Sequence, residues 1–242
     1  MMQFARRPHW LKRMVSARST HSSAGNILLT FDDGPHPAHT PAVLERLRES
    51  HLRAAFFLLG NRIDAAPQLV ERIIADGHLV GNHTDTHRRL GWFEFRSAQE
   101  EIARCQERVP QAKLFRPPFG KLTPGLLLAA RRQGLKCMNW TLDSGDWRCR
   151  GASDAKACAR QVLDLIRPGD VVLFHDNHEW IDAILDVVLP ALVSSRLLPV
   201  IERKSFFERS QTRPTSPLVE AALTSTFCGC SVSVIPSLTI NR

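Results

Sequence analysis

Short apolar runs alternate with longer amphipathic segments through most of the 242-residue chain. The runs have the length and continuous hydrophobicity of buried strands, and they cover residues 26–31, 53–59, 78–82, 113–116, 136–142, 170–175 and 197–201. The segments between them repeat apolar positions every three to four residues, which predicts helices over 40–50, 66–76, 97–109, 123–133, 153–167 and 180–194. The pattern therefore predicts seven strands separated by helices.

Strands that alternate with helices are typical of parallel β/α units, in which each helix returns the chain to the same end of the sheet. Two architectures fit this order: an open sheet with helices on both faces, and a barrel related to the eight-stranded kind. Hydrophobic periodicity does not distinguish them. Both place functional residues beyond the carboxyl ends of the strands, so the same residues become candidates in either case.

Composition divides the chain into three parts. Residues 1–24 hold five basic side chains and no acidic one, and the last 33 residues are rich in Ser, Thr and Pro with a net charge of +1. The formal net charge of +8 thus leaves +2 for residues 25–209. We predict a disordered basic arm over 1–24, a globular domain over 25–209 and a poorly ordered tail over 210–242. The nearly neutral domain is not expected to bind nucleic acid.

No segment has the pattern of a membrane span or a secretory signal. The basic arm lacks an apolar stretch, and the chain contains no run of 18 apolar residues. We predict a cytoplasmic protein, with an organelle transit peptide, non-classical export or a start codon placed too early as alternatives. The six cysteines show no CxxC spacing, which favours packed thiols; whether Cys149 and Cys158 approach each other is left open by the sequence.

Ionisable residues gather at the carboxyl ends of five predicted strands. Asp32 and Asp33 follow the first strand, and the other strand ends carry HTDTH (83–87), RPPFG (116–120), DSGDW (143–147) and FHD (174–176). Parallel strands bring these ends to one mouth. Two adjacent carboxylates repel each other, so we expect a cation or a strongly basic partner beside Asp32 and Asp33.

Asp33, His83 and His87 form a candidate metal site. The two histidines are four residues apart, which would place both imidazoles on one side of a helical turn. With a carboxylate from another strand end they make a set of two histidines and one acid, which leaves a position open for water as a catalytic metal requires. Zinc suits this set, and cobalt, nickel or manganese can replace it.

The neighbouring side chains suggest an acid and a base. Asp32 stands beside the candidate metal and is free to act as a general base, with Arg116 as its partner because a guanidinium binds a carboxylate through two donors. His175 ends an apolar strand, where an imidazole can protonate a leaving group. A half-buried imidazolium needs an acid nearby, and Asp146 is the candidate.

Together, these motifs resemble those of the polysaccharide deacetylase family, the NodB-homology domain of carbohydrate esterase family 4. In chain order they are TFDDG (30–34), HTDTH (83–87), RPPF (116–119), DSGDW (143–147) and LFH (173–175). The resemblance covers residues 25–209. It implies a distorted (β/α) barrel with about seven parallel strands.

The resemblance also implies roles for individual residues. The metal ligands would be Asp33, His83 and His87. The catalytic residues would be Asp32, Arg116, Asp146 and His175. The residues at the substrate or the oxyanion would be Phe119 through its backbone N–H, Trp147 as a pocket wall and Leu173 in the acetyl pocket. The family motif commonly ends in tyrosine where this chain has Phe119, and the chain contains no tyrosine.

The function implied is metal-dependent hydrolysis of N-acetyl or O-acetyl groups on an amino-sugar oligosaccharide or polysaccharide, such as chitin oligomers or peptidoglycan. Trp92, Trp147 and Trp180 are candidates for stacking on sugar rings, although core packing explains Trp92 equally well. The alternatives are deformylation or another C–N cleavage on the same scaffold, a catalytically silent carbohydrate-binding relative, and a nucleic-acid binder that uses the basic arm. The sequence does not indicate an oligomeric state.

Overall fold

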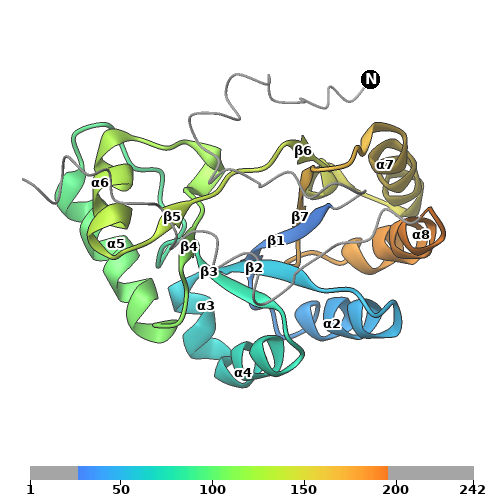
Figure 1. The fold of residues 1–242 in the computed structure, drawn as a ribbon, viewed down its shortest axis with the longest axis horizontal. Helices are drawn as coiled ribbons and strands as arrows, with labels where there is room; N and C mark the ends of the chain where they lie inside the picture. The colour runs from blue at the N-terminus through green and yellow to red at the C-terminus, as the bar shows by residue number, and fades with distance from the viewer. Residues whose placement is uncertain (1–26, 196–242) are drawn as a thin grey trace, which may run out of the picture. The chain divides into compact units, whose positions relative to one another are not determined.

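A parallel seven-stranded sheet, curled into a half-barrel, forms the centre of the fold in the computed structural model (Figure 1). The structure describes residues 27–195. The strands are β1 (Leu28–Gly34), β2 (Ala54–Leu58), β3 (Leu79–Asn82), β4 (Leu114–Phe115), β5 (Lys136–Cys137), β6 (Leu142–Asp143) and β7 (Val171–His175). They lie in the order β5-β4-β3-β2-β1-β7-β6, and every neighbouring pair is parallel.

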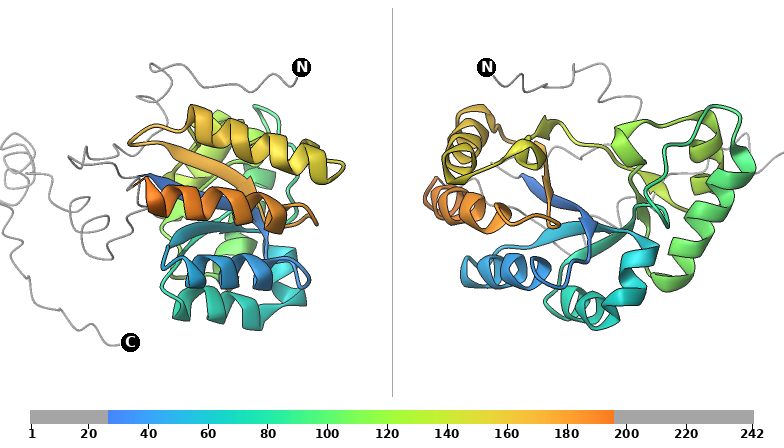
Figure 2. Two further views of the ribbon diagram at one scale, coloured as in Figure 1. Left: turned by 90° about the vertical axis from the view of Figure 1, so that its right-hand side faces the viewer. Right: turned by 180° about the vertical axis from the view of Figure 1, so that it is seen from behind.

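Helices surround this sheet, as the two further views show (Figure 2). They are α2 (Thr40–Glu49), α3 (Gly60–Ala65), α4 (Pro67–Ala75), α5 (Phe95–Arg108), α6 (Pro124–Arg132), α7 (Ala152–Leu165) and α8 (Ile181–Ser194), with the short 3₁₀ helices η1 (Pro118–Gly120) and η2 (Asp146–Arg148). All six predicted helices are confirmed, each to within two residues at either end. The six-residue helix α3 was not predicted, because it is too short to show a helical period.

The prediction of one strand over 136–142 was wrong, because this segment forms two strands at opposite edges of the sheet. Its first part pairs with β4, where Met138 N–H also donates to Phe115 O at 2.8 Å. Its last part pairs with β7, and Thr141 N–H donates to Val171 O at 2.9 Å. The residues between β5 and β6 therefore cross from one edge of the sheet to the other. This crossing curls the sheet, whose strand order is open, into a distorted barrel.

Aromatic and aliphatic side chains from alternate strand positions form the core between the sheet and the helices. Phe31 of β1 stacks on Phe56 of β2 and Phe174 of β7, with ring centroids 5.1 and 5.7 Å apart. Leu44, Leu185 and other buried residues of α2, α7 and α8 pack against them. The opposite face of β1 turns Thr30 and Asp32 toward the inside of the curled sheet, where Arg116 is buried beside both. Period-two alternation thus separates the apolar core from the polar interior.

Several predictions from the sequence fall on parts of the chain beyond the described residues. The basic arm, the Ser/Thr/Pro-rich tail and the strand over 197–201 lie outside 27–195. Within that range Cys105, Cys137, Cys149 and Cys158 are free thiols. A search of the described helices finds none that combines the length and apolar character needed to cross a membrane.

Candidate active site and metal centre

A bulge at the end of β1 brings two adjacent carboxylates to the same mouth. Side chains of neighbouring strand residues normally point to opposite faces. The pairing register of β1 with β2 shifts between Asp32 and Gly34, and Asp33 takes a left-handed backbone with φ 71°. The extra residue redirects the strand, as β-bulges beside active sites do. Asp32 and Asp33 consequently both approach His83, and Asp33 also approaches His87.

Asp33, His83 and His87 converge on one point. Asp33 Oδ1 lies 3.4 Å from His83 Nε2 and 3.3 Å from His87 Nε2, and one ligand atom from each residue lies within 4.8 Å of the other two. Two ligands on a tetrahedral zinc, each about 2.0–2.1 Å from the metal, are separated by roughly 3.3–3.4 Å. The two separations from Asp33 Oδ1 fit ligands that share one such ion.

The hydrogen bonds around these side chains leave Asp33 Oδ1 and His83 Nε2 available to bind a metal ion. Asp33 Oδ1 is buried without a hydrogen-bond partner, whereas Oδ2 accepts from Asn177 Nδ2 at 3.1 Å. His83 Nδ1 lies 2.7 Å from the carbonyl oxygen of Arg116, which favours a proton on Nδ1 and leaves Nε2 with its lone pair toward Asp33. A metal-binding histidine typically has its other ring nitrogen anchored in this way. The donor set therefore fits a divalent cation.

The local electrostatics favour positive charge at the same point. Burial raises the pKa of Asp33, but its interactions with His83, and then His175 and His87, outweigh burial and hold that pKa well below its usual range. Burial lowers the pKa of His83, yet the carboxylates of Asp32 and Asp33 raise it overall. Burial prevails at His87 and lowers its pKa. The lowered pKa of Asp33 thus leaves a carboxylate facing the two imidazoles.

The two histidines meet through an irregular loop and not through a helical turn, so that part of the sequence prediction was wrong. Residues 83–87 contain no helix, and both Thr84 (φ 73°) and His87 (φ 57°) have left-handed backbones. The imidazole centroids lie 5.1 Å apart despite this change of geometry. The loop, and not a helical period, brings the rings together.

Arg116 holds Asp32 inside the barrel. Its Nη1 donates to Asp32 Oδ1 at 2.6 Å and to Thr30 Oγ1 at 2.8 Å, and its Nε donates to Met138 O at 3.1 Å. The guanidinium has 0% exposure and lies 4.0 Å from the centroid of the Phe57 ring. The predicted two-donor contact is not formed, since only Nη1 reaches Asp32. The buried guanidinium thus pairs with Asp32 and fixes the orientation of its carboxylate.

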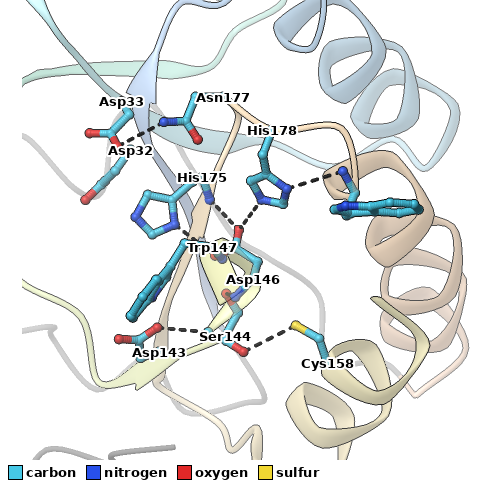
Figure 3. Close-up of polar contacts among 12 residues, drawn as sticks. Asp32, Asp33, Asp143, Ser144, Asp146, Trp147, Cys158, His175, Asn177 and His178 are labelled. Carbon is cyan, nitrogen blue, oxygen red and sulfur yellow. Dashed lines mark hydrogen bonds and ion pairs between the residues drawn. The ribbon is translucent and has the colours of Figure 1, made fainter. Parts of the chain in front are cut away.

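His175 and Asp146 form a second charged pair at the ends of β7 and η2 (Figure 3). His175 Nδ1 lies 2.8 Å from Asp146 Oδ1, and the His175 backbone N–H donates to Oδ2 at 2.6 Å. Burial alone would lower the pKa of His175, but the charge of Asp146 raises it to about 10. Burial raises the pKa of Asp146, and His175 and His178 more than reverse this effect. His175 is therefore held as an imidazolium.

The residues predicted to touch substrate lie around these groups. Phe119, in a left-handed conformation (φ 57°), is 46% exposed and its ring centroid is 4.6 Å from that of His87. Trp147 is 49% exposed, and its backbone N–H binds Asp146 Oδ1. Leu173 is buried on β7. Trp92 is 70% exposed, so core packing is excluded for it.

Three polar residues that follow β7 were given no role by the sequence predictions, although Asp176 belongs to the FHD motif. Asn177 donates to Asp33, and His178 Nε2 lies 3.2 Å from Asp146 Oδ2, as Figure 3 shows. Asp176 is fully buried, where Thr40 Oγ1 donates to its Oδ2 at 2.6 Å. Burial, only partly opposed by Thr40, raises the pKa of Asp176 to about 7. The signal was present in the run HDNH (175–178), in which one polar residue ends the apolar strand and three more follow it.

Replacing Gly34 by alanine should strain the metal-ligand segment. A Cβ at Gly34 would lie 2.5 and 2.6 Å from the two carboxylate oxygens of Asp176. Overpacking of this kind costs about 1–3 kcal/mol of unfolding free energy, and urea denaturation can measure it. The control is Gly151→Ala, because a Cβ at Gly151 would meet no atom within 4 Å. The expected loss of unfolding free energy for this variant is about 0.5 kcal/mol or less. Equal losses in the two variants would contradict this account.

Comparison with known families gives one consistent match. The family model described as polysaccharide deacetylase matches residues 20–138. A chitooligosaccharide deacetylase of Bradyrhizobium sp. (strain ANU 289) is 34% identical over 198 residues, which cover 76% of this chain and 88% of that protein. A peptidoglycan-N-acetylglucosamine deacetylase of Bacillus cereus is 31% identical over 214 residues, which cover 84% of this chain and 76% of that protein.

Solved structures share the fold as well. A family 4 carbohydrate esterase from Streptomyces lividans, in complex with acetate, superposes with a TM-score of 0.67 at 30% sequence identity. The superposition covers 75% of this chain and 95% of that one.

Proposed function

This chain belongs to the polysaccharide deacetylase family, and we propose that it hydrolyses N-acetyl groups on an amino-sugar oligosaccharide or polysaccharide. The observation that carries the proposal is that two groups of charged side chains meet at one mouth. On one side Asp33, His83 and His87 face each other beside Asp32, which Arg116 holds. On the other side His175 is held protonated by Asp146. This is a base and an acid at a candidate metal centre.

Asp33, His83 and His87 are the residues that would hold the metal, and we propose zinc because two histidines and a carboxylate suit it. When bound, the ion supplies Lewis-acid activation of water and of the acetyl carbonyl. Asp33 Oδ2 remains bound to Asn177, which fixes the carboxylate with Oδ1 toward the two imidazoles. The ligand set contributes one negative charge, so the ion would retain a net positive charge.

Asp32 is the proposed general base. Its carboxylate takes a proton from water as the oxygen of that water forms a bond to the acetyl carbon. Oδ1 is bound to Arg116, and Oδ2 faces His83 Nε2 at 3.7 Å, toward the metal site. The Phe119 backbone N–H is the proposed donor to the developing oxyanion, and a single donor of this type is typically worth about 3–4 kcal/mol of transition-state stabilisation.

His175 is the proposed general acid. An amide nitrogen leaves poorly as an anion, so it must receive a proton as the C–N bond breaks. The imidazolium of His175 donates that proton through Nε2, since Nδ1 is bound to Asp146. The products are acetate and a free amino sugar. The proton taken by Asp32 and the proton given by His175 balance the overall hydrolysis.

The substrate class follows from the relatives and from the exposed aromatic side chains. The relatives named above act on chitooligosaccharides and on peptidoglycan N-acetylglucosamine, according to their names. Trp147 offers a half-exposed indole next to His175, which suits stacking on a sugar ring. We propose a soluble N-acetylglucosamine oligomer as the substrate. A cytoplasmic location remains a prediction from the sequence.

Acetate release from defined glycans tests this function. The zinc-loaded chain should release acetate from N-acetylglucosamine oligomers, and a chelator should abolish the release until zinc is restored. Three further substrates test the alternative hydrolase activities. Peptidoglycan fragments test a different glycan, O-acetylated xylan tests O-deacetylation, and N-formyl glucosamine tests deformylation. Binding of these glycans with no acetate or formate released would instead indicate a silent carbohydrate-binding relative.

His178 is expected to set the strength of the acid. It contributes one of four hydrogen-bond contacts to the buried Asp146 carboxylate, together with Trp147 N–H and two groups of His175. The His178→Ala variant lacks this contact. The Asp146 carboxylate then interacts more strongly with the His175 imidazolium, so the pKa of His175 rises further. A weaker acid then lowers kcat, by less than about tenfold, and moves the alkaline limb of the pH–rate profile upward. An unchanged or downward-shifted limb would contradict this role.

A further inference from the structure

The loop that carries His83 and His87 has a backbone that its own sequence does not favour. Thr84 and His87 both have positive φ, although neither is glycine and threonine is β-branched. Backbones of this kind persist only where surrounding contacts determine them. Backbone hydrogen bonds from α3 hold the first part of the loop. Gly60 N–H donates to Thr84 O, and Asn61 N–H donates to Asp85 O. These bonds end at Asp85, before Thr86 and His87.

Glu101 of α5 holds the rest of the loop. Its Oε2 accepts the backbone N–H of Asp85 at 3.1 Å and that of Thr86 at 2.8 Å. Its Oε1 accepts the hydroxyl of Thr86 at 2.7 Å. Glu101 is buried, so both oxygens serve the loop with little competition from water. Hydrogen bonds to an ionised carboxylate are stronger than those between neutral groups.

The anchoring of α5 itself is separate from these contacts. Asn82 Nδ2 at the end of β3 donates to Ile102 O at 2.9 Å, and Ala98, Ile102 and Cys105 pack in the core. The helix can therefore stay in place when the Glu101 carboxylate is removed. What the carboxylate adds is a fixed backbone at Thr86, the residue directly before His87.

We propose that Glu101 is a positioning residue for the metal centre, which holds the 84–87 loop in the conformation that turns His87 toward Asp33 and His83. This inference rests on the proposed function in one respect, namely that these three residues bind a metal. It assigns to Glu101 no contact with substrate. Loss of Glu101 should therefore weaken metal binding, while the chemistry of the fully loaded protein is largely retained.

The test measures zinc affinity of the full chain, by competition with a chromogenic chelator, in variants of α5. Glu101→Ala should bind zinc about 10–100-fold more weakly than the unmodified chain, as expected when a group that orients a ligand is lost. Glu101→Gln should recover most of that affinity, because its amide oxygen can accept both backbone N–H groups. Glu100→Ala is the matched control. It removes the adjacent, exposed carboxylate that pairs with Arg96, and it should leave affinity unchanged.

Saturating zinc separates positioning from catalysis. Acetate release by Glu101→Ala should return to within a few-fold of the unmodified chain once zinc is in excess. Equal zinc affinity for Glu101→Ala and Glu100→Ala, with both folded, would overturn the proposal. Should Glu101→Ala fail to fold, Thr86→Val decides: it removes one hydroxyl donor and should weaken zinc binding about threefold, and an unchanged affinity would overturn the proposal. Failure of the unmodified chain to bind zinc would instead refute the proposed function.

Discussion

Replacing Asp32 by asparagine is expected to lower kcat by about two to four orders of magnitude while zinc affinity changes little. Asparagine has the shape of aspartate, and its amide oxygen can still accept from Arg116 Nη1, which lies 2.6 Å from Asp32 Oδ1. It cannot accept a proton from water at neutral pH. The three proposed ligand atoms belong to other residues and are unaffected. Acetate release and zinc titration on the same preparation measure both quantities.

Asp143→Asn is the matched control for this variant. Asp143 also ends a strand, and burial raises its pKa, so it is another acid at a strand end that could serve as a base. Its Oδ1 accepts the Gly145 N–H at 2.9 Å, a bond that asparagine can preserve. We expect kcat of Asp143→Asn to stay within about tenfold of the unmodified chain. A loss as large as that of Asp32→Asn would move the role of base away from Asp32.

Replacing His175 by alanine should lower kcat for N-acetyl substrates by about two to four orders of magnitude without loss of zinc. The imidazolium is the active form of the acid, so activity is present below its pKa and falls as pH rises through that value. The pKa of His175 is raised to about 10 in the chain without metal, and a bound cation would lower it by repulsion. The alkaline limb of the pH–rate profile should therefore be absent in His175→Ala.

Activated esters provide the sharper comparison for His175. A nitrophenyl acetate has a leaving group that departs as an anion and needs no proton. The His175→Ala variant should therefore retain much more of its activity on this ester than on an N-acetylglucosamine oligomer. A similar loss on both substrates would show that His175 acts on a step other than protonation of the leaving group.

The sequence predicted which strand ends meet better than it predicted their local geometry. Because parallel strands end at one edge, ionisable residues at five strand ends were expected to meet, and the structure places them at one mouth. The bulge at Asp33 was not predictable in the same way. Nothing in DDG specifies φ 71°, and strict strand alternation would have sent Asp33 away from Asp32.

Long-range contacts account for the other differences. The four-residue spacing of His83 and His87 suggested a helical turn, but the fixed backbone comes from Glu101, fourteen residues or more further along the chain. Similarly, 136–142 has the composition of one strand and is divided because its two ends pair with β4 and β7 on opposite edges. Asn177 and His178 gained significance only when the fold placed them beside Asp33 and Asp146.

Zinc stoichiometry measured by isothermal titration tests the central claim most directly, because the whole account depends on one cation shared by Asp33, His83 and His87. The unmodified chain is predicted to bind one zinc ion, Asp32→Asn and His175→Ala to bind one ion with similar affinity, and Asp33→Ala to lose it. Absence of stoichiometric binding to the unmodified chain, or unchanged binding by folded Asp33→Ala, would contradict the account.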